Sequence, residues 1–206
     1  MKKIMFNDRY ELTQSVLEGH KTMTRRIIPQ LMATDNYYVS DWKSNNGGKA
    51  YVCVYKGGCH IEIYPAYQIG EIVAVAQKYI DLCNCSAFYE ALSKADPTFP
   101  LECIKGEKGC NNKMFVKAAW MPHRIKITNI KIERLQDISD DDCFKEGIRW
   151  DYADYPYMNE KTYFFTDYEG FESPRMAFSK LINRVCGKST WELNPWVLAY
   201  EFELVK

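Results

Sequence analysis

Glu18-Gly19-His20-Lys21-Thr22-Met23-Thr24-Arg25-Arg26 is the stretch from which the rest of the chain is best interpreted. Six consecutive positions in it carry one amine, two hydroxyls and two guanidinium groups. A short helix is predicted just before it, with Asp8 and Glu11 in the spacing of a capping box and Gly19 suited to end the helix in a left-handed conformation. A turn so dense in hydrogen-bond donors predicts a site for an anionic or amide-bearing ligand.

Length and composition indicate that residues 1–206 form one substantial domain, or a small domain with large insertions. Hydrophobic residues make up 47% and aromatic residues 15% of the 206 positions, which is enough for a substantial core. The 27 basic and 27 acidic residues cancel, so any nucleic-acid site must be a local patch. The first residues are too polar for a signal peptide, and no apolar run approaches membrane-spanning length. We therefore expect a cytoplasmic protein with no membrane partner. The oligomeric state stays open.

Hydrophobic patterning predicts strands joined by short helices. The expected strands lie within 33–69, at 72–76, at 124–135 with a bulge near Thr128-Asn129, and at 196–205. Helices are expected over 86–95, after the N-cap Ser139 and after the N-cap Ser173, and a Tyr-rich loop over 152–170. Because long helices do not alternate with the strands, the pattern favours a mixed α+β protein built on a small β-barrel decorated by short helices.

The nine-residue stretch is similar to the signature of the ASCH domain family, whose members share a PUA-like barrel. The likeness continues through Tyr64-Pro65-x-Tyr67-x-x-Gly70-Glu71, Met121-Pro122 with Arg124-Ile125-x-Ile127, Glu133 to Ser139, Cys143-x-x-Glu146-Gly147-Ile148, and Trp191-x-x-Asn194-Pro195-Trp196-Val197. The resemblance implies a single PUA-like domain of the larger, insertion-bearing type, with insertions at about 30–63 and 80–115. We interpret the second stretch as an insertion or a lid rather than a separate domain.

The resemblance also implies a cleft used for RNA, nucleotides or modified nucleosides. In the smaller bacterial N(4)-acetylcytidine amidohydrolases of this family a Lys, a Thr and a Glu carry the chemistry, and they fall on Lys21, Thr24 and Glu146. Many larger members carry a charged pair where this chain has Ala76 and Gln77. Two functions stay open: binding of RNA or a modified nucleoside or nucleotide in a cationic cleft, which we prefer, and removal of an acyl group from N(4)-acetylcytidine or a similar base.

Each function assigns roles to the stretch. Amide hydrolysis needs a nucleophile, a base and an acid, which Thr24, Lys21 and Glu146 can supply if burial lowers the pKa of the lysine. Ligand binding is assigned to Thr22, Arg25 and Arg26 as hydroxyl and anion contacts. The competing interpretation is a solvated turn followed by ordinary strand residues.

Two further groups of residues carry side chains that could bind a metal or a nucleic acid. Cys83, Cys85, Cys103 and Cys110, with His60 as a substitute, lack a paired C-x-x-C spacing, so neither a metal site nor a cofactor is predicted. A second group of aromatic and basic residues can stack bases or take part in core and hairpin packing, and we favour packing. Its members are Tyr37, Tyr38, Trp42, Tyr51, Tyr55, Lys43, Lys49 and Lys56.

Overall fold

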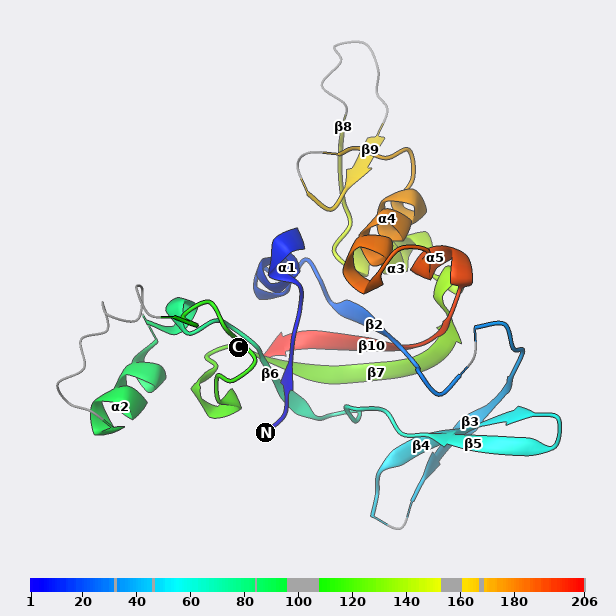
Figure 1. Cartoon of the computed structure of the whole chain (residues 1–206), viewed down its shortest axis with the longest axis horizontal. Helices are drawn as coiled ribbons and strands as arrows, with labels where there is room; N and C mark the ends of the chain where they lie inside the picture. The colour runs from blue at the N-terminus through cyan, green and yellow to red at the C-terminus, as the bar shows by residue number, and fades with distance from the viewer. Residues whose placement is uncertain are drawn as a thin grey trace.

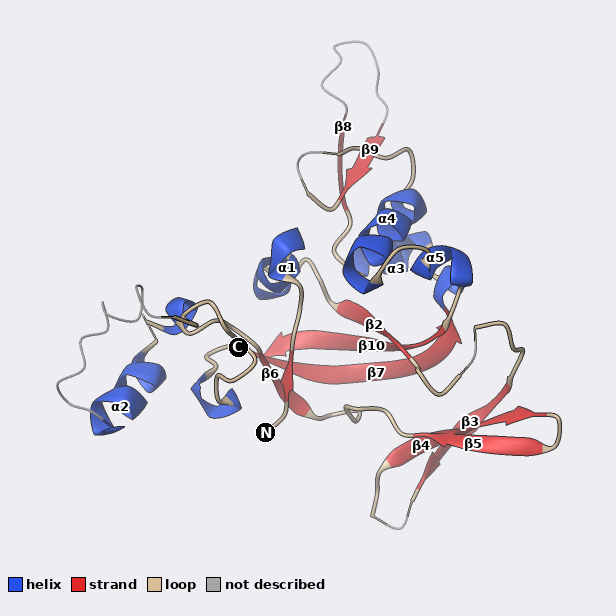
Figure 2. Cartoon of the chain, in the orientation of Figure 1, coloured by secondary structure: helices blue, strands red, loops and turns tan. Residues whose placement is uncertain are grey.

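The fold is mixed α/β, with helices placed at the ends and over one side of a central sheet (Figures 1 and 2). We describe it from a computed structural model, which covers residues 1–31, 33–45, 47–83, 85–95, 108–152, 161–166 and 169–205, with backbone alone at 87, 91, 92 and 95. Among the helices in these ranges, none has the length and apolar character needed to cross a bilayer.

The central sheet has five strands in the order β1-β6-β7-β10-β2. Their bounds are Lys3–Ile4 (β1), Met23–Ile27 (β2), Ile72–Val75 (β6), Arg124–Arg134 (β7) and Trp196–Val205 (β10). β1 runs parallel to β6, and the other neighbours are antiparallel. The β7–β10 register shifts between Glu201 and Phe202, where the partner changes from Asn129 to Ile127, so the predicted bulge is confirmed.

This sheet is open, in contrast to the expected barrel. β1 and β2 are its edge strands, and within the described chain no backbone ladder joins them. β1 contributes only two residues, and the chain after it is linked to β2 by a side chain, because Arg26 Nη2 donates to the Met5 carbonyl at 2.6 Å. The mixed α+β class is therefore confirmed, while closure is replaced by a side-chain bridge between the two edges.

A second sheet, of three antiparallel strands, occupies the predicted β region at 33–69. It contains β3 (Tyr38–Ser44), β4 (Ala50–Lys56) and β5 (Cys59–Ile63). Val52, Val54 and Ile63 are buried in the same core as the central sheet, so one face of this small sheet is covered. Alternation along a strand turns the neighbouring residues of β4 and β5 to the other, outer face.

The helix ends were predicted in part. α3 (Asp140–Lys145) and α4 (Pro174–Cys186) begin at the predicted caps, with the Ser139 and Ser173 hydroxyls accepting from backbone N–H groups. Gly19 is left-handed after α1 (Leu12–Leu17), with φ of +79°. The capping box was wrong: a short 3-10 turn precedes α1, and Glu11 itself adopts the left-handed conformation between them.

Three further elements complete the described chain. β8 (Arg149–Tyr152) and β9 (Lys161–Phe164) form a hairpin, of which β9 and Tyr152 lie in the predicted loop over 152–170. α5 (Thr190–Leu193) precedes β10. Residues 153–160 and 167–168 of that predicted loop lie outside the described residues. The helix predicted at 86–95 is confirmed as α2 (Ser86–Ala95).

The second insertion has its own small core. Leu82, Phe88, Val116 and Met121 are buried together beside β6. Figure 1 places α2 far from α4, so in this structure α2 does not cover the α4 side of the sheet as a lid would. Residues 96–107 of the insertion lie outside the described part of the chain.

Candidate functional site

A cavity of about 320 Å³ lies between the segment that follows β1 and strand β2. The segment after β1 forms one wall, β2 forms another, and α4 supplies an apolar side. It is lined by Met5, Phe6, Asn7, Leu12, Lys21, Thr24, Arg25, Arg26, Ile27, Glu146, Phe178, Leu181, Ile182, Val185 and Cys186. Five of the six residues predicted as site residues are in this lining; Thr22 is not.

Lys21 and Glu146, which are 125 positions apart in the chain, meet in the cavity wall. Lys21 Nζ donates to Glu146 Oε2 at 2.5 Å and to the Glu146 carbonyl at 2.7 Å. The two residues are only 2% and 4% exposed. The charged pair is therefore held almost entirely out of water.

Gly147 permits this close approach. Its φ is +101°, and a Cβ at this position would lie 3.2 Å from Ser15 Oγ and 3.6 Å from Lys21 Cβ. A larger residue would strain the backbone and push the end of α3 away from Lys21. The glycine after Glu146 thus brings the carboxylate within reach of the lysine.

Arg25 contacts three carboxylates at once. Its Nη1 donates to Glu146 at 3.1 Å, its Nη2 to Asp142 at 2.8 Å, and both Nε and Nη2 donate to Glu133, at 2.9 and 2.6 Å. Asp142 and Glu146 are four residues apart, which places them on one face of α3. Lys131 also donates to Asp142 at 2.8 Å, so three cations and three anions alternate in a network that includes Lys21, Arg25 and Glu146 of the cavity lining and extends beyond it.

The environment shifts the pKa values of this network in different directions. Burial lowers the pKa of Lys21, and the nearby Glu146 only partly opposes that effect. Burial also disfavours the charged form of Arg25, but Glu146 and Glu133 outweigh it and the pKa is raised. For Asp142, burial is outweighed by hydrogen bonds from Lys131 and Arg25, which lower the pKa. Of Lys21 and Arg25, Lys21 consequently loses its proton more readily.

Thr24 offers an unused hydroxyl in the same cavity. The residue is 6% exposed, and within the described chain its hydroxyl makes no hydrogen bond. Thr22, in contrast, lies outside the cavity lining. Its backbone N–H donates to the Lys145 carbonyl at 2.8 Å. Arg26 is exposed and lies over the Phe6 ring with 5.8 Å between the guanidinium carbon and the ring centroid.

Several residues of the site were not predicted from the sequence. Glu133 and Asp142 neutralise Arg25, and the apolar wall comes from Phe6, Phe178 and Leu181. The i, i+4 spacing of Asp142 and Glu146 was a usable signal, whereas nothing local to Glu133 marks it as a partner of Arg25.

The other residues singled out from the sequence lie elsewhere. Gln77 is 8% exposed and outside the cavity lining, and among the described residues its Oε1 has no hydrogen-bond partner. Cys83 and Cys85 are free thiols, and Cys103 lies outside the described residues. His60 instead lies near Cys53 and Glu62.

The aromatic group is divided between packing and exposure. Tyr37 packs edge-on against Trp196, with 6.1 Å between ring centroids, and Tyr51 stacks on Tyr64 at 5.2 Å. Tyr38 remains 73% exposed. Its ring nevertheless lies 6.2 Å from that of Tyr55, its partner across the β3–β4 pair, so Tyr37 packs against the central sheet and Tyr38 within its own small sheet.

The cavity thus joins a buried ion pair, an available hydroxyl and an apolar wall. No protein-family model matches the chain, and no curated protein or solved structure is significantly similar to it.

Proposed function

We propose that this cavity binds an N-acylated nucleobase, such as that of N(4)-acetylcytidine, and hydrolyses its exocyclic amide. One observation carries the proposal: Lys21, Thr24 and Glu146, drawn from two distant segments, line one cavity, with Lys21 and Glu146 in direct contact at 2.5 Å. Hydrolysis needs these groups to converge, whereas binding alone does not.

The fold part of the proposal is a PUA-like domain of the ASCH type with two insertions. The motifs that resemble the family lie in or next to the central sheet and α3, including the stretch that leads into β2 and the one at the end of α3. The first proposed insertion forms the β3–β5 sheet, whose buried residues join the main core, and the second contains α2, which packs in a small core beside β6. The separate packing of α2 supports a family core that carries an added segment.

The charge balance of the cavity favours a neutral ligand. Lys21 and Arg25 are compensated by Glu146, Glu133 and Asp142. Buried cations that are already paired contribute little net attraction for phosphate. The apolar wall suits the faces of a planar base, and the volume of about 320 Å³ is within the range of small-ligand pockets.

The chemistry follows from the placement of the three groups. The Thr24 hydroxyl attacks the acyl carbonyl carbon while its proton passes to the neutral amine of Lys21. Collapse of the tetrahedral intermediate breaks the carbon–nitrogen bond, and the leaving exocyclic nitrogen takes that proton back from Lys21. Water then cleaves the threonyl ester, releasing a carboxylic acid and restoring the hydroxyl. Burial supports this role, because a lowered pKa makes the neutral amine available at lower pH.

Glu146 is a positioning group in this scheme. Its two carboxylate oxygens accept from Lys21 and Arg25, which fixes the orientation of the carboxylate. A carboxylate held in this way can accept a hydrogen bond from the exocyclic amine of the base while it stabilises the lysine when protonated.

The test is hydrolysis of N(4)-acetylcytidine by the purified protein, followed by chromatography. Thr24→Val removes the hydroxyl with little change in shape, and we expect it to abolish turnover, while Thr24→Ser retains part of it. Thr22→Val is the matched control, because it removes a neighbouring hydroxyl outside the cavity, and it should keep the parent rate. Equal rates for the Thr24→Val and Thr22→Val proteins would refute the mechanism.

Binding of RNA or a nucleotide without turnover is the second proposal, and the exposure of Arg26 in the cavity lining favours it. Calorimetric titration with cytidine and cytidine 5′-monophosphate separates the two. If Arg26 contacts a phosphate, Arg26→Gln weakens binding of the monophosphate and leaves cytidine binding unchanged. Absence of turnover together with this selective loss would favour the binding module over the hydrolase.

A further inference from the structure

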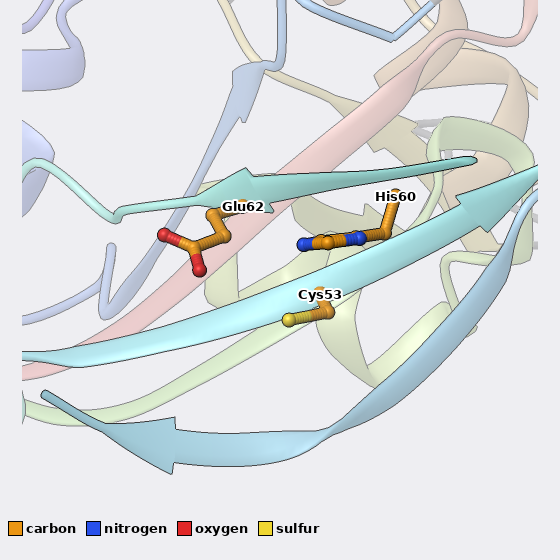
Figure 3. Close-up of side chains that lie close together, drawn as sticks. All are labelled: Cys53, His60 and Glu62. Atoms are coloured by element: carbon orange, nitrogen blue, oxygen red, sulfur yellow. The ribbon is translucent and has the colours of Figure 1, made fainter.

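We infer that the outer face of the β3–β5 sheet carries a zinc-binding site formed by Cys53, His60 and Glu62. The thiol of Cys53, the imidazole of His60 and the carboxylate of Glu62 have ligand atoms that all lie within 4.8 Å of one another (Figure 3). A thiolate, an imidazole nitrogen and a carboxylate oxygen are the three ligand types that proteins offer to Zn²⁺.

The pairing of β4 with β5 holds the three residues together. Glu62 lies directly opposite Cys53 in the register, and His60 precedes Glu62 by two residues, so both β5 residues share one face. Val52 and Val54 are buried on the inner side, which turns Cys53 to the outer face. The ligand backbones are thus fixed by strand pairing before any metal binds, which reduces the entropy that binding must overcome.

Neighbouring aromatic residues orient two of the ligands. The Tyr64 hydroxyl donates to Glu62 Oε2 at 2.8 Å, which leaves the other carboxylate oxygen for a metal. The Tyr55 ring lies against the His60 imidazole with centroids 5.7 Å apart. Partners of this kind restrict ligand orientation around a metal.

The charges of the proposed complex also balance. A Cys53 thiolate and the Glu62 carboxylate together cancel the two positive charges of Zn²⁺, with His60 neutral. Binding therefore releases the thiol proton. Three protein ligands leave the fourth tetrahedral position for water, so the site stays open to solvent.

Lys43 supplies a further test of this arrangement. Its Nζ lies 3.7 Å from Cys53 Sγ, so its ammonium competes with a metal cation for the same sulfur. Lys43 is exposed, so it can swing away when a metal binds. We expect Lys43→Gln to bind zinc several-fold more tightly than the parent protein; weaker binding by this variant would contradict the assigned geometry.

The main experiment uses the full chain freed of metal with a chelator and titrated with Zn²⁺ by calorimetry, and with Co²⁺ as a spectroscopic probe. We expect one equivalent to bind and a thiolate-to-cobalt charge-transfer band to appear. Cys53→Ser should abolish the band, and His60→Ala should weaken binding by at least about tenfold. Cys59→Ser is the matched control. Cys59 is an exposed cysteine of β5, the strand that carries His60 and Glu62, and its position faces away from those two residues.

Two outcomes would overturn the inference. One is a band that persists in Cys53→Ser, and the other is a band lost in Cys59→Ser or Cys85→Ser. Because Cys53 is buried and its replacement can disturb packing, His60→Ala provides the fold-safe variant, as His60 is exposed. Zinc should raise the melting temperature of the parent and of Cys59→Ser more than that of His60→Ala, and an equal rise in all three would also refute the site.

This inference is independent of the proposed hydrolase. The cluster belongs to the β3–β5 sheet, whereas the cavity is lined by β2, α4 and their neighbours. The two proposals are told apart by measuring both activities on His60→Ala. This variant should bind zinc more weakly and should hydrolyse N(4)-acetylcytidine at the rate of the parent.

Discussion

The cavity network and the outer face of the β3–β5 sheet both gather ionisable side chains from paired elements, yet they differ in burial. Lys21 and Glu146 are 2% and 4% exposed, while His60 and Glu62 are exposed. In the cavity every buried charge has an opposite partner, because an unpaired charge there would be very costly. On the outer face water reaches His60 and Glu62, although the Cys53 thiol beside them is buried, so the two exposed groups can remain incompletely partnered and available to a metal. Burial therefore makes one cluster sensitive to substitution and leaves the other free to bind.

The largest expected effect tests this sensitivity at Arg25. Arg25→Leu leaves Glu133, Asp142 and Glu146 without their shared cation, and we expect a loss of about 3–5 kcal/mol in the free energy of unfolding, measured with urea. Arg26→Leu is the matched control on the same strand. It removes an exposed arginine with one carbonyl contact, and it should cost about 1 kcal/mol or less. Similar losses for the two variants would break the comparison.

The next effect concerns acid. Hydrogen bonds from Lys131 and Arg25 outweigh burial and lower the pKa of Asp142 below its ordinary 3.8. A carboxyl group with a lowered folded-state pKa stabilises the protein above its unfolded pKa, and this stability is lost as pH falls through the folded value. Unfolding free energy should therefore fall below about pH 4.

Two variants isolate this contribution. Asp142→Asn should be less stable than the parent at neutral pH and should show a shallower decline in acid, measured by urea unfolding at a series of pH values. Asp141→Asn, at the exposed neighbouring position, should follow the parent curve. If Asp142→Asn also follows the parent curve, the buried network does not determine the acid response.

A smaller effect is expected at α3, the helix that carries Asp142 and is followed by Glu146. The Ser139 hydroxyl accepts from the Asp142 N–H at 3.1 Å, and Ser139→Ala should cost about 1 kcal/mol, since an N-cap is lost. Ser179→Ala within α4 is the comparison, because its hydroxyl bonds its own helix at the Met176 carbonyl. That change should be neutral or slightly stabilising, and thermal unfolding monitored by circular dichroism would distinguish the two.

The smallest stability effect belongs to the outer face. Tyr64→Phe removes the hydrogen bond to the exposed Glu62 and should leave the metal-free protein as stable as the parent. The same change should weaken zinc binding about tenfold, since an outer partner of a ligand is lost. A destabilised metal-free protein with unchanged zinc affinity would show that Tyr64 acts in packing alone.

Features that depend on neighbouring residues were predicted well. The caps Ser139 and Ser173, the left-handed Gly19 and the strands now seen as β4, β7 and β10 all carry local signals. The β8–β9 hairpin was missed because both strands are four residues long and show no alternation of buried and exposed positions.

The candidate site was predicted less evenly. Lys21, Thr24 and Glu146 were named through a family resemblance, and their convergence in one cavity is a property of the folded chain. His60 was grouped with distant cysteines, because Cys53 lies in an apolar run that has the pattern of a core strand. Only the strand register shows that Cys53 faces Glu62 instead.

The sequence by itself determined the mixed α+β class, most helix ends and the donor-rich stretch before β2, because backbone propensity, capping and alternation act over a few residues. The tertiary structure alone decided that the sheet stays open between β1 and β2, that a cavity lies between the segment after β1 and β2, and that Arg25 is neutralised by three carboxylates. These contacts join residues more than a hundred positions apart. Their geometry depends on strand register and on packing across the whole core, which no local pattern specifies.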